Sequence, residues 1–271
     1  MSATRVAATQ GIAPLDVAFL RYSIPALMLA PIWLAMFRKL RKAPVWSLVA
    51  MLGWGAPFLW LVTASLQHSN VIYMATIVPC TMPLFAVMVE RLVFKHHLSR
   101  SQKAGFLLIA LAALLVLIRA LARDNNVTST SIGFMLLAAA GWSAYVVAFR
   151  HTGLTAPEGT AWVSIASSVA ILLVKLATDS PLLTMSLEQF FFQAFAQGVL
   201  SGFLAVILYT FAIERLGAAR AASFTVLMPA IGVTFAWIWL GETPSLYSTF
   251  ALALGMTGVA VVNGLIRRVS R

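Results

Sequence analysis

Nine apolar runs, each about 18 to 24 residues long, follow one another along the chain with short polar segments between them. They cover residues 16–36, 46–66, 70–93, 102–119, 132–150, 159–178, 190–213, 218–240 and 246–266. A helix rises about 1.5 Å per residue, so a run of this length crosses a hydrocarbon core of about 30 Å. The pattern predicts nine transmembrane helices and leaves no room for a soluble domain.

Composition agrees with this pattern. The chain is 61% hydrophobic and 10% charged, with a mean hydropathy of +0.92. Backbone polar groups in lipid must be satisfied within each segment, which predicts an all-α polytopic membrane protein. The net charge of +11 does not indicate nucleic-acid binding, because Lys and Arg collect in the cytoplasmic loops of such proteins.

The distribution of Lys and Arg predicts the orientation. Alternate loops on one side of the predicted membrane, together with the C-terminal tail, hold 14 of the 19 basic residues, and the other side holds five. Under the positive-inside rule the richer side is cytoplasmic, and so is the C-terminus. Nine crossings then place the elbow at residues 11–16 on the outer face.

An outer elbow so close to the start of the chain predicts a truncated helix. Only residues 2–10 precede the elbow, and as a helix they span about 14 Å, half a membrane. We therefore expect most of a first helix to be missing from this chain.

An internal repeat supports that expectation. A shift of 146 positions aligns Pro83 with Pro229, Leu108 with Leu254 and Val116 with Val262. Nearer the start of each half, GIAPLD (11–16) resembles GLTAPE (153–158), with one residue inserted. The second elbow follows a full apolar run and is predicted to face the cytoplasm. The halves, 1–123 and 132–271, are thus predicted to be inverted five-helix repeats, the first lacking most of its opening helix, as in transporters with a midplane site.

Several segments resemble the EamA-type transporters of the drug/metabolite transporter superfamily. They are IERLGAARA (213–221) with Pro229, LGETPS (240–245), and SATRVAATQGIAPLDVAFLRY (2–22). The resemblance covers essentially the whole chain and implies a ten-helix bundle, an inner-membrane location and export of amino acids or related metabolites. Where the second repeat has Gly241-Glu242, the first has Lys95-His96.

The residues do not favour an enzyme. Proteases and transferases need paired carboxylates, a metal cluster, or a nucleophile beside a base. The Asp, Glu and His residues fall at run ends or in loops, and Cys80 is the single cysteine. We therefore expect no catalytic residues, no metal and no cofactor. The expected partners are a small-molecule substrate and the lipid bilayer.

Candidate cavity residues are the aromatics that lie deep in the runs beside small or hydroxyl residues. They are Trp54, Trp60, Tyr73, Trp142, Tyr145 and Tyr209. A polar-tipped ring facing lipid would leave its O–H or N–H without a partner, so some of these rings are expected to face a cavity. The alternative for each is packing against a neighbouring helix.

Pro83 and Pro229 complete the predicted cavity, because broken helices at matching positions of two halves indicate a transporter's site. The alternative is a pair of kinks with no special role. Arg21, about one turn after Asp16, is a candidate for attracting an anionic substrate group near the outer mouth. Its alternative is an interfacial pair with Asp16 that reaches outward to water.

These features predict an inner-membrane exporter of small metabolites, such as amino acids or their derivatives, that works by alternating access. The alternatives are a non-transporting fragment of such a transporter, or a carrier of drug-like or lipid-linked substrates. Gly198 and Gly202 form a GxxxG pattern, which indicates close helix packing within the bundle or, alternatively, a homodimer seam.

Overall fold

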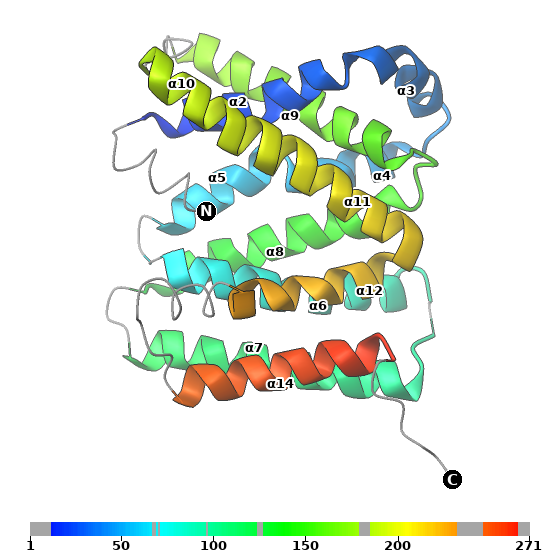
Figure 1. The fold of residues 1–271 in the computed structure, drawn as a ribbon. Helices are drawn as coiled ribbons and strands as arrows, with labels where there is room; N and C mark the ends of the chain where they lie inside the picture. Colours follow the sequence, from blue (N-terminus) through cyan, green and yellow to red (C-terminus); the bar gives the residue numbers. More distant parts are fainter. Residues whose placement is uncertain are drawn as a thin grey trace. The chain divides into compact units, whose positions relative to one another are not determined.

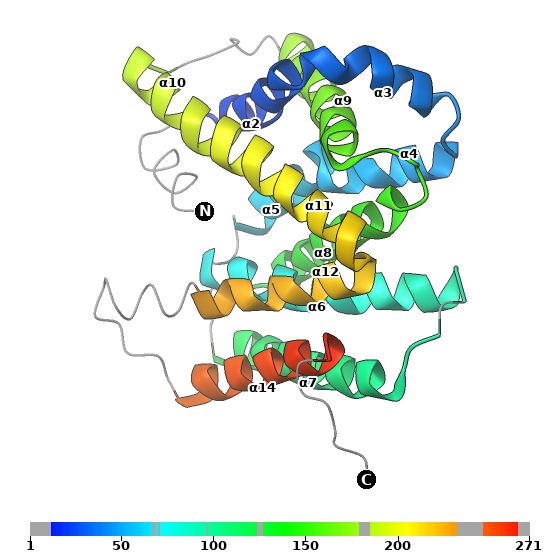
Figure 2. The same ribbon diagram turned by 45° about the vertical axis from the view of Figure 1, so that its right-hand side comes forward.

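The computed structural model describes residues 12–66, 69, 71–95, 97–123, 127–178, 185–231 and 246–264. Every regular element in these ranges is helical (Figures 1 and 2), which confirms the all-α prediction. The chain divides into two compact units. The first unit joins Met1–Trp60 to Ala148–Arg215, and the second joins Leu61–Val147 to Leu216–Arg271. Each unit therefore combines parts of both sequence halves.

The first unit is built on α2 and α9, which pack against each other. Its helical elements are α2 (Pro14–Met28), η1 (Ala30–Ile32), α3 (Trp33–Leu40), α4 (Val45–Met51), η2 (Leu52–Trp54), the start of α5 (Ala56–Leu66), α9 (Ala156–Ala177), α10 (Leu187–Gln193), the π-helical η3 (Ala194–Leu204) and α11 (Ala205–Leu216). The α2 and α3 segments meet at a bend of 57°. Pro25 and Pro31 flank this bend, and proline removes a helical hydrogen bond.

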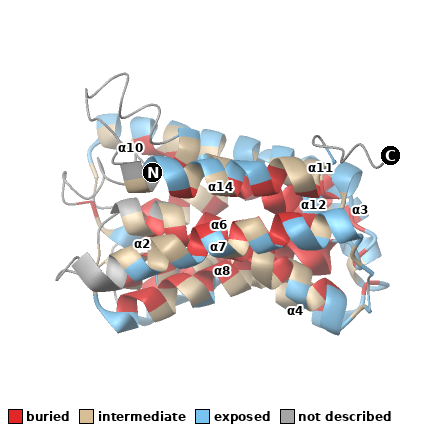
Figure 3. Cartoon of the chain, turned by 90° about the horizontal axis from the view of Figure 1, so that it is seen from below, coloured by how far each residue is buried: buried red, intermediate tan, exposed pale blue. Residues whose placement is uncertain are grey.

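The second unit is built on α6, α7, α12 and α14. Their bounds, with those of the other elements of this unit, are α6 (Val71–Leu92), α7 (Arg100–Arg123), α8 (Ser129–Phe149), α12 (Ala218–Ser223), η4 (Phe224–Val226) and α14 (Leu246–Val262). The α7 and α14 helices lie side by side along their length (Figures 1 and 2). Figure 3 shows buried residues along α8, whereas exposed residues outnumber buried ones in α4 and α10.

The described helices fit a multi-pass membrane protein. Five of them are long and apolar enough to cross a bilayer, or six if the bent pair from Pro14 to Leu40 is one span. Two further apolar helices, Ala218–Ile231 and Thr249–Val262, are shorter. The run predicted at 218–240 extends beyond the described residues, so the count of nine stays a prediction. The proposed remnant of a first helix, residues 2–10, also lies outside them.

Glycines bring α7 and α14 close together. A Cβ atom on Gly105 would lie 2.7 Å from the carbonyl oxygen of Gly258, which no real side chain could do without moving the backbone. Two hydroxyl groups hold the same helix pair. Ser101 donates to the carbonyl oxygen of Val261 at 3.0 Å, and Tyr247 donates to that of Leu115. The two donors are 146 positions apart, and so are the two acceptors, so one bond maps onto the other under the repeat.

The GxxxG pattern in η3 serves packing within the chain. A Cβ atom on Gly198 would meet the side chain of Ile24, and one on Gly202 would lie 2.1 Å from the backbone oxygen of Arg21. Both glycines therefore face α2. This contact confirms the prediction of close approach inside the bundle, and a homodimer through the same pattern would compete with it.

Candidate functional site

A small cavity lies among α2, α9 and η3 with α11 in the first unit. It is lined by Arg21, Tyr22, Trp54, Val163, Ser164, Gly202 and Val206. Its volume of about 10 Å³ leaves room for roughly one water molecule. A metabolite could occupy it only after these helices separate.

Arg21 is the charged residue of this cavity. Its side chain is half-buried, and it forms no ion pair with any other residue within the described ranges. Gly202 presses against the backbone of Arg21 from η3, which fixes the position of the α2 backbone at this point. The arrangement places a guanidinium group at a small, partly apolar cavity, where a carboxylate would be its natural partner.

Asp16 forms an ion pair with Lys175, whereas the partner considered from the sequence was Arg21. Its carboxylate accepts from the ammonium group of Lys175 at 2.6 Å, and the two side chains are 0% and 2% exposed. Asp16 lies at the start of a helix, which agrees with its predicted place at a run end, but its burial was not apparent from the sequence. It is the third residue of α2, and the approach of Lys175, 159 positions later, removes it from solvent.

One of the predicted aromatics lines the cavity, and a second packs against it. Trp54 lines it, and Tyr209 packs edge-on against Trp54 with ring centroids 5.6 Å apart. Tyr22, which was not singled out from the sequence, is buried beside them and donates from its hydroxyl to the carbonyl oxygen of Gly55 at 2.8 Å. Its position one residue after Arg21 in α2 was the available signal.

The other predicted residues are not among those that line this cavity. Trp60 is 64% exposed, as expected for a ring that faces lipid. In the second unit, Tyr73 is half-buried, Trp142 and Tyr145 are buried in α8, and Pro83 and Pro229 are also buried. Of the predicted cavity set, the first unit therefore brings together Arg21, Trp54 and Tyr209.

The predicted kink in α6 has a structural partner. Pro83 has no N–H and so frees the carbonyl group four residues earlier, at Pro79. The hydroxyl of Thr225, in η4, donates to that carbonyl at 2.8 Å and is itself buried. Residues 79 and 225 are 146 positions apart, so the contact joins equivalent positions of the two sequence halves.

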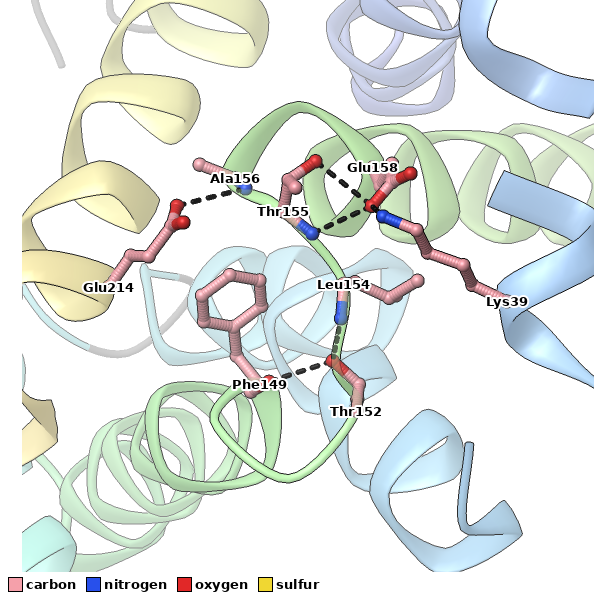
Figure 4. Close-up of polar contacts among 8 residues, drawn as sticks. All are labelled: Lys39, Phe149, Thr152, Leu154, Thr155, Ala156, Glu158 and Glu214. Carbon is pink, nitrogen blue, oxygen red and sulfur yellow. Dashed lines mark hydrogen bonds and ion pairs between the residues drawn. The ribbon is translucent and has the colours of Figure 1, made fainter. Parts of the chain in front are cut away.

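A second polar cluster lies at the start of α9 (Figure 4). One carboxylate oxygen of Glu158 accepts from the ammonium group of Lys39 at 2.8 Å, and from the backbone N–H and hydroxyl of Thr155 at 2.7 and 2.9 Å. Glu214 accepts from the N–H of Ala156 at 3.3 Å. Carboxylates near a helix N-terminus satisfy its free N–H groups and its dipole.

Comparison with known proteins shows to which family this chain belongs. The sequence matches the EamA-like transporter family over residues 2–118 and again over 129–264. The chain belongs to this family. It is therefore a multi-pass membrane transporter of the drug/metabolite transporter superfamily, which confirms the resemblance seen in the sequence.

A crystal structure of another protein shares the fold of this EamA-like chain. The TM-score is 0.69 with 18% sequence identity, over 99% of this chain and 94% of that one. No curated protein matches the sequence. Within the described residues, no three His, Cys, Asp or Glu side chains lie close enough to hold a metal ion together.

Proposed function

We propose that this EamA-like protein is an inner-membrane secondary transporter that exports small metabolites, such as amino acids or their derivatives, by alternating access. The observation that carries the proposal is Arg21 at the cavity beside Trp54 and Ser164. Arginine offers a planar fork of donors that matches a carboxylate. An aromatic wall and a hydroxyl group suit the remainder of an amino-acid-like substrate.

The size of the cavity supports a cycle with an occluded state. About 10 Å³ cannot contain a metabolite, so binding requires movement of α2, α9 or η3. Movement towards one membrane face and then the other would expose Arg21 to each side in turn, as expected for a site between repeats. The excess of basic residues in alternate loops supports a cytoplasmic C-terminus.

An efflux assay on Arg21 variants tests this proposal. The unmodified protein is reconstituted into liposomes and supplied with a panel of the common amino acids and the amines formed from them by decarboxylation. We expect transport of one or more amino acids. Replacing Arg21→Gln should raise KM for them by about tenfold or more, because a charge-assisted bond contributes about 1.5–3 kcal/mol.

The amines serve as an internal control, since they lack the carboxylate and should be affected little by Arg21→Gln. Arg21→Lys keeps the charge but loses the fork, so an intermediate KM is expected. The matched variant Arg41→Gln removes an exposed arginine just after α3 and should behave like the unmodified protein. If Arg21→Gln leaves KM unchanged, as Arg41→Gln is expected to do, Arg21 is rejected as the carboxylate site.

A further inference from the structure

Two ion pairs join the bent helix α2–α3 to α9, one near each end of α9. Asp16 of α2 pairs with Lys175 at 2.6 Å, and Lys39 of α3 pairs with Glu158 at 2.8 Å. Glu158 and Lys175 are 17 residues apart, which corresponds to about 25 Å along the helix. Because a hydrocarbon core is about 30 Å thick, the two pairs lie near opposite faces of the membrane.

The two pairs are built in the same way. Asp16 and Glu158 are each the third residue of their helix, each close after a proline, within the similar segments APLD (13–16) and TAPE (155–158). Each carboxylate pairs with a lysine near the end of the other helix, in the opposite half of the sequence. Carboxylates at helix starts and lysines at helix ends also suit the two helix dipoles.

The pairs enclose the cavity between them. Arg21 and Tyr22 of α2 follow Asp16, and Val163 and Ser164 of α9 lie between Glu158 and Lys175. A substrate that reaches the cavity between these antiparallel helices from one face must separate them at that face. This separation requires breaking the ion pair at that end, whereas the pair at the far end can stay intact.

The two ends are not equally closed. Both side chains of the Asp16–Lys175 pair are buried, whereas the Lys39 side chain is 45% exposed. A buried charge without a partner is strongly unfavourable, but a solvated lysine loses little when it leaves its carboxylate. Glu158 also keeps its bonds from Thr155 when Lys39 departs. Separating α2–α3 from α9 therefore costs more free energy at the Asp16–Lys175 end than at the Lys39–Glu158 end.

We propose that Asp16–Lys175 and Lys39–Glu158 are opposing gate latches, each of which stabilises closure of α2–α3 against α9 at one membrane face. The four residues are positioning residues that set the balance between the two open states and do not bind the substrate. Weakening one latch favours the state that is open at its end, and closes the other end more tightly.

Hydrogen–deuterium exchange of the full chain in lipid nanodiscs, without substrate, tests this reciprocity. One variant, Asp16→Asn with Lys175→Gln, removes both charges of the buried latch together, so that neither residue keeps its charge after the other has lost it. The other, Lys39→Gln with Glu158→Gln, does the same at the opposite end. The amides measured are those of residues 156–160 and of residues 172–177, the two ends of α9.

We expect the ratio of exchange rates at the two ends to change by about fivefold or more, in opposite directions for the two variants. In each variant, exchange should rise at the neutralised end and fall at the far end. The matched control is Glu188→Gln, which removes an exposed carboxylate at the second position of α10 and should leave the ratio unchanged. A merely structural role predicts faster exchange at the altered end alone, or at both ends. Either of these results, or an unchanged ratio of exchange rates, would contradict the proposal that the two ion pairs act as opposing latches.

This inference rests on the proposed alternating-access function, but the two can fail separately. Absence of transport by the unmodified protein would reject the function. Normal transport together with no reciprocal change in exchange would reject the latches alone.

Discussion

The hydroxyl group of Thr225 donates to the backbone carbonyl oxygen of Pro79, 146 positions earlier, at 2.8 Å. Pro83 has removed the usual helical partner of that carbonyl. The same hydroxyl lies 2.7 Å from the carbonyl oxygen of Ala222, so its one proton is shared between two acceptors. A kink predicted from the sequence is thus matched by a specific donor on the equivalent helix.

Replacing Thr225→Val should destabilise the protein because the isosteric side chain leaves a buried carbonyl without a donor. Such a group costs about 1–3 kcal/mol. The loss should appear as a lower midpoint of thermal unfolding in detergent. Thr225→Ser retains the hydroxyl and should lose much less. Thr257→Val is the control, since Thr257 is exposed and bonds only within α14; an equal loss in that variant would contradict the role given to Thr225.

Two glycines in helix interiors should respond to alanine in opposite ways. Gly105→Ala places a methyl group against the backbone of α14, so we expect a lower unfolding midpoint and a lower yield. Gly133→Ala meets nothing within 4 Å and should be neutral or stabilising, by up to about 1 kcal/mol from helix propensity. A stable Gly105→Ala variant would show that the α7–α14 contact is looser than the structure indicates.

The aromatic pair Trp54–Tyr209, of which Trp54 lines the cavity, should affect transport more than abundance. Trp54→Ala and Tyr209→Ala remove the rings that pack edge-on there, so efflux should fall several-fold at matched membrane level. Trp60→Ala removes an exposed ring of the same kind and should leave efflux unchanged. If the first two variants simply disappear from the membrane, the rings belong to the core.

Reporter fusions test the proposed orientation. A reporter placed after Lys42 or Lys103 should be cytoplasmic, and one placed within residues 125–131 should be external, because of the charge distribution. The two classes are distinguished by paired reporters that are active on opposite sides of the membrane. The reverse pattern would reject both the orientation and the inverted-repeat arrangement derived from it.

The apolar runs predicted where helices form, because every backbone group in lipid needs an intrahelical partner. The runs did not predict the local helix type. Residues 52–54 and 224–226 form 3-10 turns inside two of the runs, and nothing in their apolar residues distinguishes them from α-helix. The shift of 146 positions drew attention to Pro83, but the sequence did not show that Thr225 donates to the carbonyl of Pro79, which this proline frees.

The candidate site was only partly predictable. Residue type and depth in a run indicated Trp54 and Tyr209, but they indicated Trp60 equally. The Trp60 ring is exposed because it lies on the outer face of α5, which the sequence did not show. Trp142 and Tyr145 carried the same signal, yet Tyr145 is 0% exposed. Its replacement by Ala is therefore expected to cost about 3–5 kcal/mol, as for other buried aromatics. The Asp16–Lys175 pair depends on two helices distant in sequence, which local patterns do not report.

The paired bonds between α7 and α14 have a consequence for how this chain can change over evolutionary time. In both bonds a side-chain hydroxyl reaches a main-chain oxygen, at Val261 and at Leu115. Every amino acid carries that oxygen, so mutations at the accepting positions leave the acceptors of these two hydrogen bonds in place. The donors are not identical either, being Ser101 on one helix and Tyr247 on the other. Each half can therefore accumulate its own mutations while α7 and α14 stay bonded to each other, so the two helices can adapt to different chemical surroundings.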